Sequence, residues 1–184
     1  MVREEMLFDG QAFLELEDWP LMNDYDIAVL MGIHAKDFTF YFGTKHDYER
    51  EVLDLYAKQH LLDAKTRLSC CFRRPTKRVK KYLIYLTLEY TLKPNMTDIL
   101  FFPLAGSIQH RSVSNQFLNQ LTKFLATCLK ETIETIRLES EYLETYSREI
   151  IESHLRHLKK MNREEMYSFS QKIRKNNELL KNPK

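Results

Sequence analysis

The chain has 184 residues and a mass of 22.1 kDa, which suits one ordinary domain or a small domain joined to a medium one. The hydrophobic fraction is 43%, with only four Gly and five Pro, which argues against a sandwich or barrel with many tight turns and against collagen-like or linker-like chains. The net charge of +2 hides an asymmetry: residues 1–48 carry ten acids and three bases, whereas residues 58–93 carry ten bases and two acids. An uneven distribution of charge of this kind informs which partners a protein binds and says little about its fold.

Location is constrained by what the sequence lacks. No apolar run reaches the ~20 residues that a membrane-spanning helix needs, so we expect no membrane contact of that kind. Five acids before residue 18 are unlike a signal peptide. The three cysteines are odd in number and lack metal-type spacing, so a reducing cytoplasm is the simplest location.

Apolar residues recur at helical spacing along almost the whole chain, and no segment keeps a period of two, so we expect an all-α protein. Helix starts are marked by Asn23, Thr44 and Asn162, each with an acid three residues later. Gly32 marks a helix end. The predicted helices are 3–17, 24–31, 35–41, 45–66, 75–92, 97–102, 112–138, 141–161 and 163–180.

Residues 24–42 form a helix, a glycine turn and a second short helix, the pattern of a helix-turn-helix. Five apolar residues can point inward and fix the crossing of the two helices: Ile27, Ala28, Ile33, Phe38 and Phe42. The outer face of the second helix is then free to enter a major groove of DNA. Similar helix pairs also occur in α-proteins that do not bind DNA, so the pattern alone leaves both interpretations open.

Residues 27–45 spell IAVLMGIHAKDFTFYFGTK, which resembles the signature of the TetR family of transcriptional regulators. In that family an Ile-Ala pair precedes the turn, an aromatic run follows it, and a Ser/Asn-Lys pair opens the next helix. Thr44-Lys45 stands at that last pair, Trp19 at an upstream aromatic position and Asn23 at the position that caps the second helix. The resemblance covers about residues 3–55.

The resemblance implies a helix-turn-helix DNA-binding domain at residues 1–48 and a helical effector-binding and dimerisation domain at residues 49–184. Tyr41 and Lys45 match positions that touch DNA phosphates in the family. His34 stands where a Ser usually caps the helix, while Lys36 and Thr39 depart from the usual Gly and Tyr. The residues expected at the DNA are His34, Ala35, Lys36, Thr39, Phe40, Tyr41 and Lys45.

The function implied is a homodimeric, ligand-responsive regulator, expected to be a repressor, that sets one helix of each copy into successive major grooves of a palindromic operator in double-stranded DNA. A small-molecule effector would bind among the central helices, for which the aromatic candidates are Tyr82, Tyr85, Phe101, Phe102 and Phe117. The apolar stripes 117–136, 143–161 and 166–180 exceed what a small domain is expected to cover. Two of these three helices should therefore pair with their symmetry mates in a four-helix interface.

The acid excess of residues 1–48 opposes binding to DNA phosphates. The alternative is a degenerate family member that no longer binds DNA and acts through protein–protein contact. An enzyme is a third and least favoured hypothesis, because we find no Gly-rich phosphate loop, Ser elbow, paired carboxylates or His-Glu metal motif. No cofactor is expected.

Three further features have a structural and a functional interpretation, and we favour the structural one in each case. The basic run 73–81 suits a solvated helix start better than an anion site. The adjacent Cys70 and Cys71 suit a helix end better than a thiol sensor. His154 and His157 share a helical face but have no third ligand there, so a polar stripe is favoured over a metal site.

Overall fold

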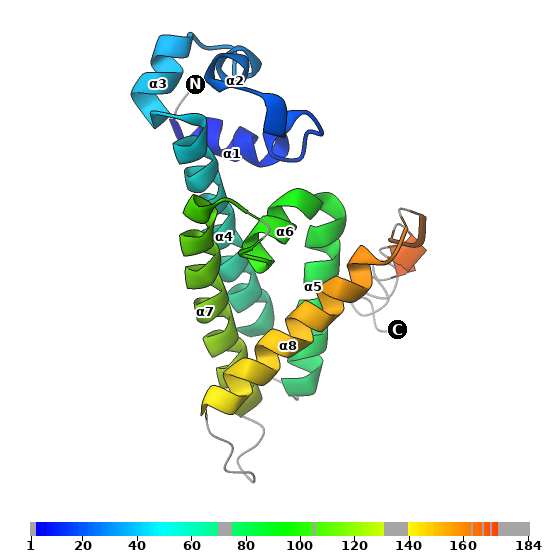
Figure 1. Ribbon diagram of the computed structural model, residues 1–184. Coiled ribbons are helices and arrows are strands. Elements are labelled where there is room, and N and C mark those ends of the chain that lie inside the picture. The colour runs from blue at the N-terminus through cyan, green and yellow to red at the C-terminus, as the bar shows by residue number, and fades with distance from the viewer. Residues whose placement is uncertain are drawn as a thin grey trace. The chain divides into compact units, whose positions relative to one another are not determined.

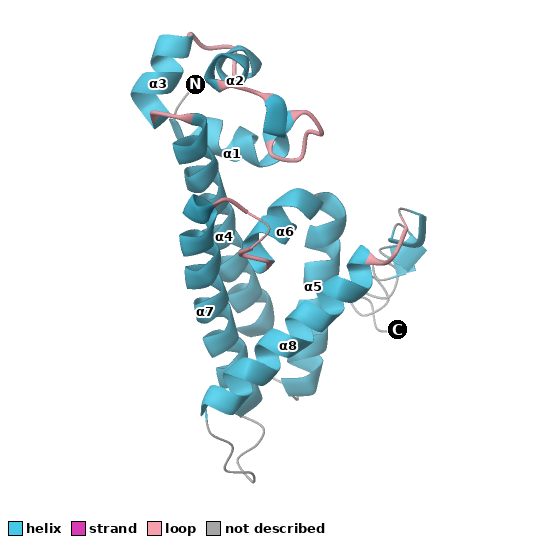
Figure 2. Ribbon diagram, in the orientation of Figure 1, coloured by secondary structure: helices cyan, strands magenta, loops and turns pink. Residues whose placement is uncertain are grey.

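The computed structural model describes residues 3–69, 75–104, 106–130, 140–162, 164–166, 168–169 and 171–172. Every regular element in these residues is a helix, so the predicted all-α fold is confirmed (Figure 2). In chain order the elements are α1 (Arg3–Phe13), the short 3₁₀ helix η1 (Trp19–Leu21), α2 (Asp24–Leu30), α3 (Ala35–Phe42), α4 (Lys45–Ser69), α5 (Pro75–Leu92), α6 (Pro94–Phe101), α7 (Ile108–Lys130) and α8 (Ser140–Lys159). Among the described residues, no helix is both long and apolar enough to cross a membrane.

The chain forms two compact units. The first combines residues 1–62 with residues 93–118, and the second combines residues 63–92 with residues 119–184. The long helices α4 and α7 therefore contribute residues to both units. The predicted boundary between a DNA-binding domain and an effector-binding domain, after residue 48, falls within α4. That division of roles stays a prediction.

In the first unit, α1, α2 and α3 gather at the N-terminal turns of α4 (Figure 1). Tyr48 of α4 is fully buried, and its ring packs edge-on against Phe38 and Phe42, with ring centroids 5.7 and 4.8 Å apart. The Tyr48 hydroxyl donates a 2.8 Å hydrogen bond to the carbonyl oxygen of Met6 in α1. One side chain thereby fixes both α1 and α3 against α4.

The capping signals act as predicted. The side chain of Asn23 accepts from the backbone N–H of Asp26, and the carboxylate of Asp26 accepts from the backbone N–H of Asn23. Asn162 and Glu165 form the same reciprocal pair, with distances of 3.0 and 2.8 Å. These bonds satisfy backbone donors that a helix start leaves open. Gly32 follows the end of α2 with φ of +68°, a conformation that favours glycine.

Some predicted helix bounds were wrong. The first helix ends at Phe13, and η1 was not predicted at all. Helix α6 starts at Pro94 instead of residue 97, and α7 starts at residue 108 instead of 112. Proline is favourable in the first helical turn because its missing N–H has no partner there. The carboxylate of Glu15 caps α6, accepting the backbone N–H groups of Asn95 at 2.9 Å and Met96 at 2.8 Å.

In the second unit, α5 packs against α8. The inward face of α8 has buried residues at positions 143, 147, 151, 155 and 158, the helical spacing expected of a core face. Part of this core is a cluster of Ala126, Leu129 and Leu143, with Val79 packed against it. The hydroxyl of Thr87 donates to the carbonyl of Leu83 and is hydrogen-bonded to Nε2 of His154, 2.8 Å away. Burial lowers the pKa of His154.

Candidate nucleic-acid interface

The helix pair α2 and α3 is joined by residues 31–34 and held by its buried face. Ile27, Ala28 and Phe38 are fully buried, and Phe42 is nearly so. The backbone N–H of Ile33 donates to the carbonyl of Ala28 at 3.0 Å, which closes the turn onto α2. The residues predicted to point inward therefore do so, except that Ile33 is only half-buried. This packing determines which face of α3 meets solvent.

The outer face of α3 carries the predicted DNA-contact residues of this helix. Lys36, Thr39, Phe40 and Tyr41 are all exposed, Phe40 to 83%. Asp37 is also exposed and balances the charge of Lys36, so the formal charge of this face is zero and the face is not acidic. The exposure of these side chains also means that the described chain does not cover the face. The Thr39 hydroxyl donates back to the carbonyl of Ala35 at 3.0 Å.

His34 and Ala35 stand at the start of α3. His34 is exposed and occupies the residue before the helix, but its side chain makes no capping hydrogen bond there. Ala35 is half-buried. The first backbone N–H groups of α3 therefore receive no cap from His34, and a helix start of this kind suits an anionic oxygen.

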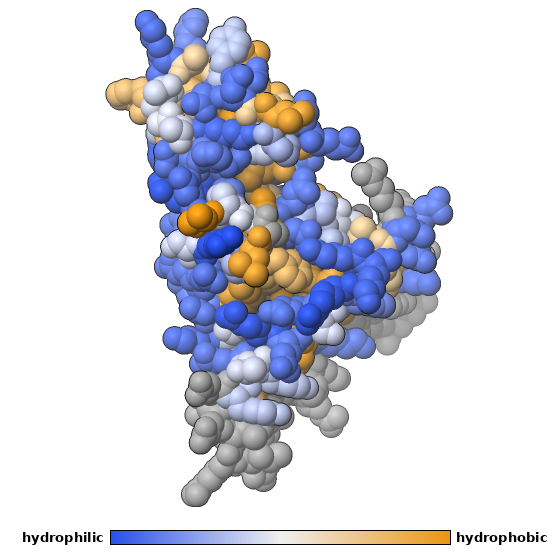
Figure 3. Space-filling view, viewed as in Figure 1, coloured by the Kyte–Doolittle hydropathy of each residue, from blue (hydrophilic) through white to orange (hydrophobic). Residues whose placement is uncertain are grey.

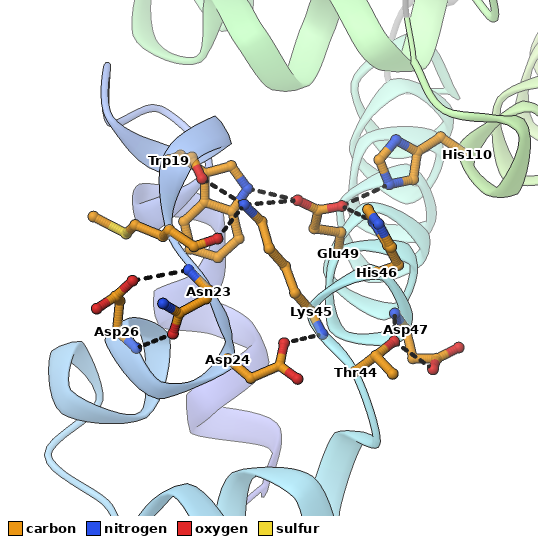
Figure 4. Close-up of polar contacts among 11 residues, drawn as sticks. Trp19, Asn23, Asp24, Asp26, Thr44, Lys45, His46, Asp47, Glu49 and His110 are labelled. Carbon is orange, nitrogen blue, oxygen red and sulfur yellow. Dashed lines mark hydrogen bonds and ion pairs between the residues drawn. The ribbon is translucent and has the colours of Figure 1, made fainter.

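Lys45 lies with its ammonium directed inward (Figure 4). Its Nζ donates to the carbonyl oxygens of Trp19 at 2.6 Å and Met22 at 2.8 Å and stands 5.0 Å from the centre of the Trp19 ring. The backbone N–H of Lys45 donates to Asp24 at 2.8 Å. The side chain of Lys45 is 13% exposed. Lys45 thus ties η1 and the start of α2 to the first turn of α4, and a phosphate contact would compete with these bonds.

Arg3 is also engaged within the fold. Its guanidinium pairs with Glu51 of α4, donates to the carbonyl oxygen of Tyr41, and stands 5.2 Å from the centre of the Phe42 ring. Arg3 therefore ties α1 and the end of α3 to α4. Of the three bases in residues 1–48, Lys36 is the one whose side chain is exposed with no ion-pair partner among the described residues.

Glu49 forms the polar centre of the same region, and nothing in the sequence pointed to its role except its position four residues after Lys45 (Figure 4). Its buried carboxylate accepts from Nε1 of Trp19 at 2.8 Å and from Nδ1 of His46 at 3.2 Å. Nε2 of His110 lies 3.5 Å away. Burial disfavours the charge of Glu49, but the contacts with His110, Trp19 and His46 outweigh it and lower its pKa. The carboxylate thereby links η1 to α4 and α7.

The five residues predicted to line an effector pocket fall in both units. Phe101 and Phe117 are buried in the first unit and pack edge to face on each other and on His60, with ring centroids 5.2 to 5.5 Å apart. Phe102 caps the end of α6. Tyr82 and Tyr85 are buried in the second unit. Tyr82 lines an apolar cavity of about 10 Å³ between α5, α7 and α8, which is room for no more than one water molecule.

The outer side of α8 presents an open, shallow surface. Its lining residues are Tyr146, Glu149, Ile150, Ser153, His154 and His157. Tyr142 and Tyr146 are exposed on this helix and stack with an interplanar angle of 4°. The helix therefore has two faces, one buried within the second unit and one, partly aromatic, that the described residues leave uncovered.

Several predicted features lie wholly or partly outside the described residues. These are Cys70-Cys71, the first part of the basic run 73–81, the end of the helix expected at 112–138 and most of the helix expected at 163–180. Among the residues that the structure describes, no three His, Cys, Asp or Glu side chains are grouped so that they could hold a metal ion.

Comparison with known proteins identifies no family for this chain. No protein-family model matches the chain, and no curated protein matches it. The resemblance of residues 3–55 to the TetR family therefore stays an expectation that the quoted residues carry.

Proposed function

We propose that the protein is a TetR-like, DNA-binding transcriptional regulator that acts in the cytoplasm, without catalytic activity. The observation that carries the proposal is the outer face of α3, where exposed Lys36, Phe40 and Tyr41 project from a helix that Phe38 and Phe42 anchor in the core. A rigidly held helix with a free outer face can enter a major groove. Aromatic side chains on that face suit contact with thymine methyl groups.

The charges of the region define the kind of DNA binding to expect. Each phosphate that a protein neutralises adds about 0.9 to the slope of log affinity against log salt. Arg3 and Lys45 are held within the fold, so Lys36 is the cation of residues 3–48 that is available for a phosphate. We therefore expect few phosphate contacts per copy, modest affinity, and recognition that depends on contacts within the groove.

Replacing Lys36 with alanine should weaken specific binding by about tenfold and reduce the salt slope by about 0.9 per copy. The measurement is a titration of the full chain against DNA from upstream of its own coding region, at low and moderate salt. Lys58→Ala is the matched control, since Lys58 is an exposed lysine paired with Asp54 at 2.5 Å on α4. Lys45→Ala is unsuitable because it also removes bonds that hold the fold.

Two outcomes of this titration would contradict the DNA proposal. One is absence of binding even at low salt while the protein stays folded and associated. The other is equal weakening by Lys36→Ala and Lys58→Ala, which would indicate a general effect of net charge and no defined contact by α3.

We further propose that the protein is a homodimer that pairs through the uncovered face of α8. This face carries the exposed rings of Tyr142 and Tyr146 on an open, shallow surface, and the exposed faces of long helices are the elements that pair in a four-helix interface. Tyr146→Asp should convert the dimer to a monomer in sedimentation at about micromolar concentration, because it buries an unpaired charge at the contact. Lys123→Asp, a charge reversal at an exposed position of α7, should leave the dimer intact. A monomeric unmodified chain would refute this assembly.

The regulator would respond to a small molecule bound in its helical domain. In this structure the cavity beside Tyr82 is too small for such a ligand, so binding would require movement of the surrounding side chains. A ligand that favours one arrangement of the helices over another changes DNA affinity by its difference in affinity for the two states.

A protein-contact role without DNA binding is the second candidate function. The inward position of Lys45 favours it, because one of the two residues expected to touch phosphates is occupied by the carbonyls of Trp19 and Met22. The ten acids of residues 1–48 also favour this role, because they oppose contact with DNA phosphates.

A further inference from the structure

The outward side of η1 and α2 exposes apolar side chains that the fold does not use. Leu21 is 87% exposed, Tyr25 65%, Val29 60% and Leu30 41%. We call these four residues the α2 outer face. Figure 3 shows hydrophobic surface over the part of the first unit where η1 and α2 lie in Figure 1. Contiguous exposed apolar residues mark sites of interaction more often than scattered single ones do.

The arrangement of these residues follows from the short helix. Ile27 and Ala28 take the buried side of α2, so the rows formed by residues 25 and 29 and by residues 26 and 30 are left outside. In a helix that only meets water these rows are normally polar. Here Asp26 is the one charged residue among the four, and apolar side chains hold the other three positions.

Acids dominate the charge around this face, since the one lysine beside it, Lys45, is 13% exposed and held by the carbonyls of Trp19 and Met22. Residues 4–35 contain eight acids and no Lys or Arg. Exposed Asp26 lies within the face, and exposed Asp18 is on the same turn as Leu21, whose backbone N–H donates to the Asp18 carbonyl at 2.9 Å. Acids placed here repel the phosphates of nucleic acids and the headgroups of anionic lipids. A partner for this face must therefore be apolar and cationic.

We propose that the α2 outer face is a docking site for a cationic amphipathic helix of a partner protein. Leucine-type side chains of that helix pack on Leu21, Tyr25 and Val29, and its Lys or Arg residues pair with Asp18 and Asp26. An amphipathic helix presents such a pattern along one side. The site is separate from the outer face of α3, so it goes beyond the DNA contact proposed above and holds whether or not that contact forms.

The test uses a fluorescein-labelled synthetic peptide of about 18 residues, with Leu at helical spacing on one side and Lys on the other. Fluorescence anisotropy reports its binding to the full chain. We expect binding that Tyr25→Ser/Val29→Ser weakens by about tenfold or more and that Asp18→Asn weakens by about threefold. Asp18 suits this test because its side chain makes no capping hydrogen bond. Phe8→Ser, at a 60% exposed position of α1, is the matched control and should bind the peptide unchanged.

Peptide controls separate recognition from general attraction. A peptide with Glu in place of each Lys should not bind, and a scrambled peptide of the same composition should bind about tenfold more weakly. The proposal is overturned if the unmodified protein does not prefer the cationic amphipathic peptide, or if Tyr25→Ser/Val29→Ser binds it as the unmodified protein does. The proposal is also overturned if the unmodified chain self-associates and Tyr25→Ser/Val29→Ser abolishes that self-association, because the occupant of the face would then be a second copy of the chain. DNA affinity of the same variants is measured in parallel and should stay unchanged, so that a failure of DNA binding is recognised separately.

Discussion

Replacing Gly10 with alanine is expected to lower the free energy of unfolding by about 3 kcal/mol. A Cβ at this position would lie 2.6 Å from Cγ2 of Val52 and 2.8 Å from Cζ of Tyr48, with the Tyr48 hydroxyl oxygen closer still. Both side chains are fully buried, so neither can move aside freely. Helix α1 would have to shift away from α4, which strains the bond from Tyr48 to the Met6 carbonyl.

A double-mutant cycle with chemical denaturation tests this cause. Tyr48→Phe removes the hydroxyl that the new methyl group meets first, so Gly10→Ala should cost about 1 kcal/mol less in that background. Gly32→Ala is the matched control. It should cost about 1 kcal/mol through its positive φ alone, since no atom lies within 4 Å of its Cβ position, and it should add independently to Tyr48→Phe. Additive costs for Gly10→Ala and Tyr48→Phe would contradict the predicted contact.

Most of the fold followed from the spacing of apolar residues. The helices from α2 to α5 were predicted within a few residues, because apolar residues recur at helical spacing along them and because Asn23 and Thr44 mark the starts of α2 and α4. Besides the unpredicted η1 and the earlier start of α7, the misses are at α1 and α6, and these two share one cause. Glu15 leaves the helical pattern to cap α6, about eighty positions later in the chain, and this stabilises a start at Pro94. Local sequence patterns do not contain a cap supplied from so far away.

The candidate site was predictable in its helices and less so in its polar groups. The buried and exposed sides of α3 follow from helical periodicity, and the structure has Phe38 and Phe42 inside with Phe40 outside. The direction of Lys45 does not follow, because its acceptors are backbone carbonyls more than twenty residues earlier. Glu49 was missed for a related reason: its partners come from η1 and α7 as well as from its own helix.

The acid excess of residues 1–48 is partly structural. A count of charges treats every carboxylate as free, yet Glu15 caps α6, Asp26 completes the cap of α2, and Asp24 accepts the backbone N–H of Lys45. At the start of α4, the Asp47 carboxylate accepts from the Thr44 hydroxyl, whose oxygen in turn accepts the backbone N–H of Asp47. These acids are positioned by the donors that they satisfy within the fold, so their number reflects the needs of the fold as well as the choice of partner.

Acidification from about pH 7 to about pH 5 is expected to lower the free energy of unfolding by about 2 kcal/mol through His60 alone. His60 is 1% exposed and is surrounded by the rings of Tyr56, Phe101 and Phe117. Burial, with a smaller contribution from the charge of Lys93, lowers the pKa of His60 from 6.5 to about 3. Between these values the unfolded chain binds a proton that the folded chain does not. Stability from this residue is therefore complete above the unfolded pKa and falls by about 1.4 kcal/mol for each pH unit below it.

The measurement is the slope of unfolding free energy against pH, taken from denaturant titrations between about pH 7 and about pH 5. His60→Phe keeps an aromatic ring in the cluster and removes the titrating group, so its slope should be smaller than that of the unmodified protein by about 1 kcal/mol per pH unit. Phe117→Leu is the control, since it loosens the same cluster and lowers stability at every pH while it leaves the slope in place. An unchanged slope in His60→Phe would contradict the prediction, because the pH dependence of stability over this range would then come from other titrating groups.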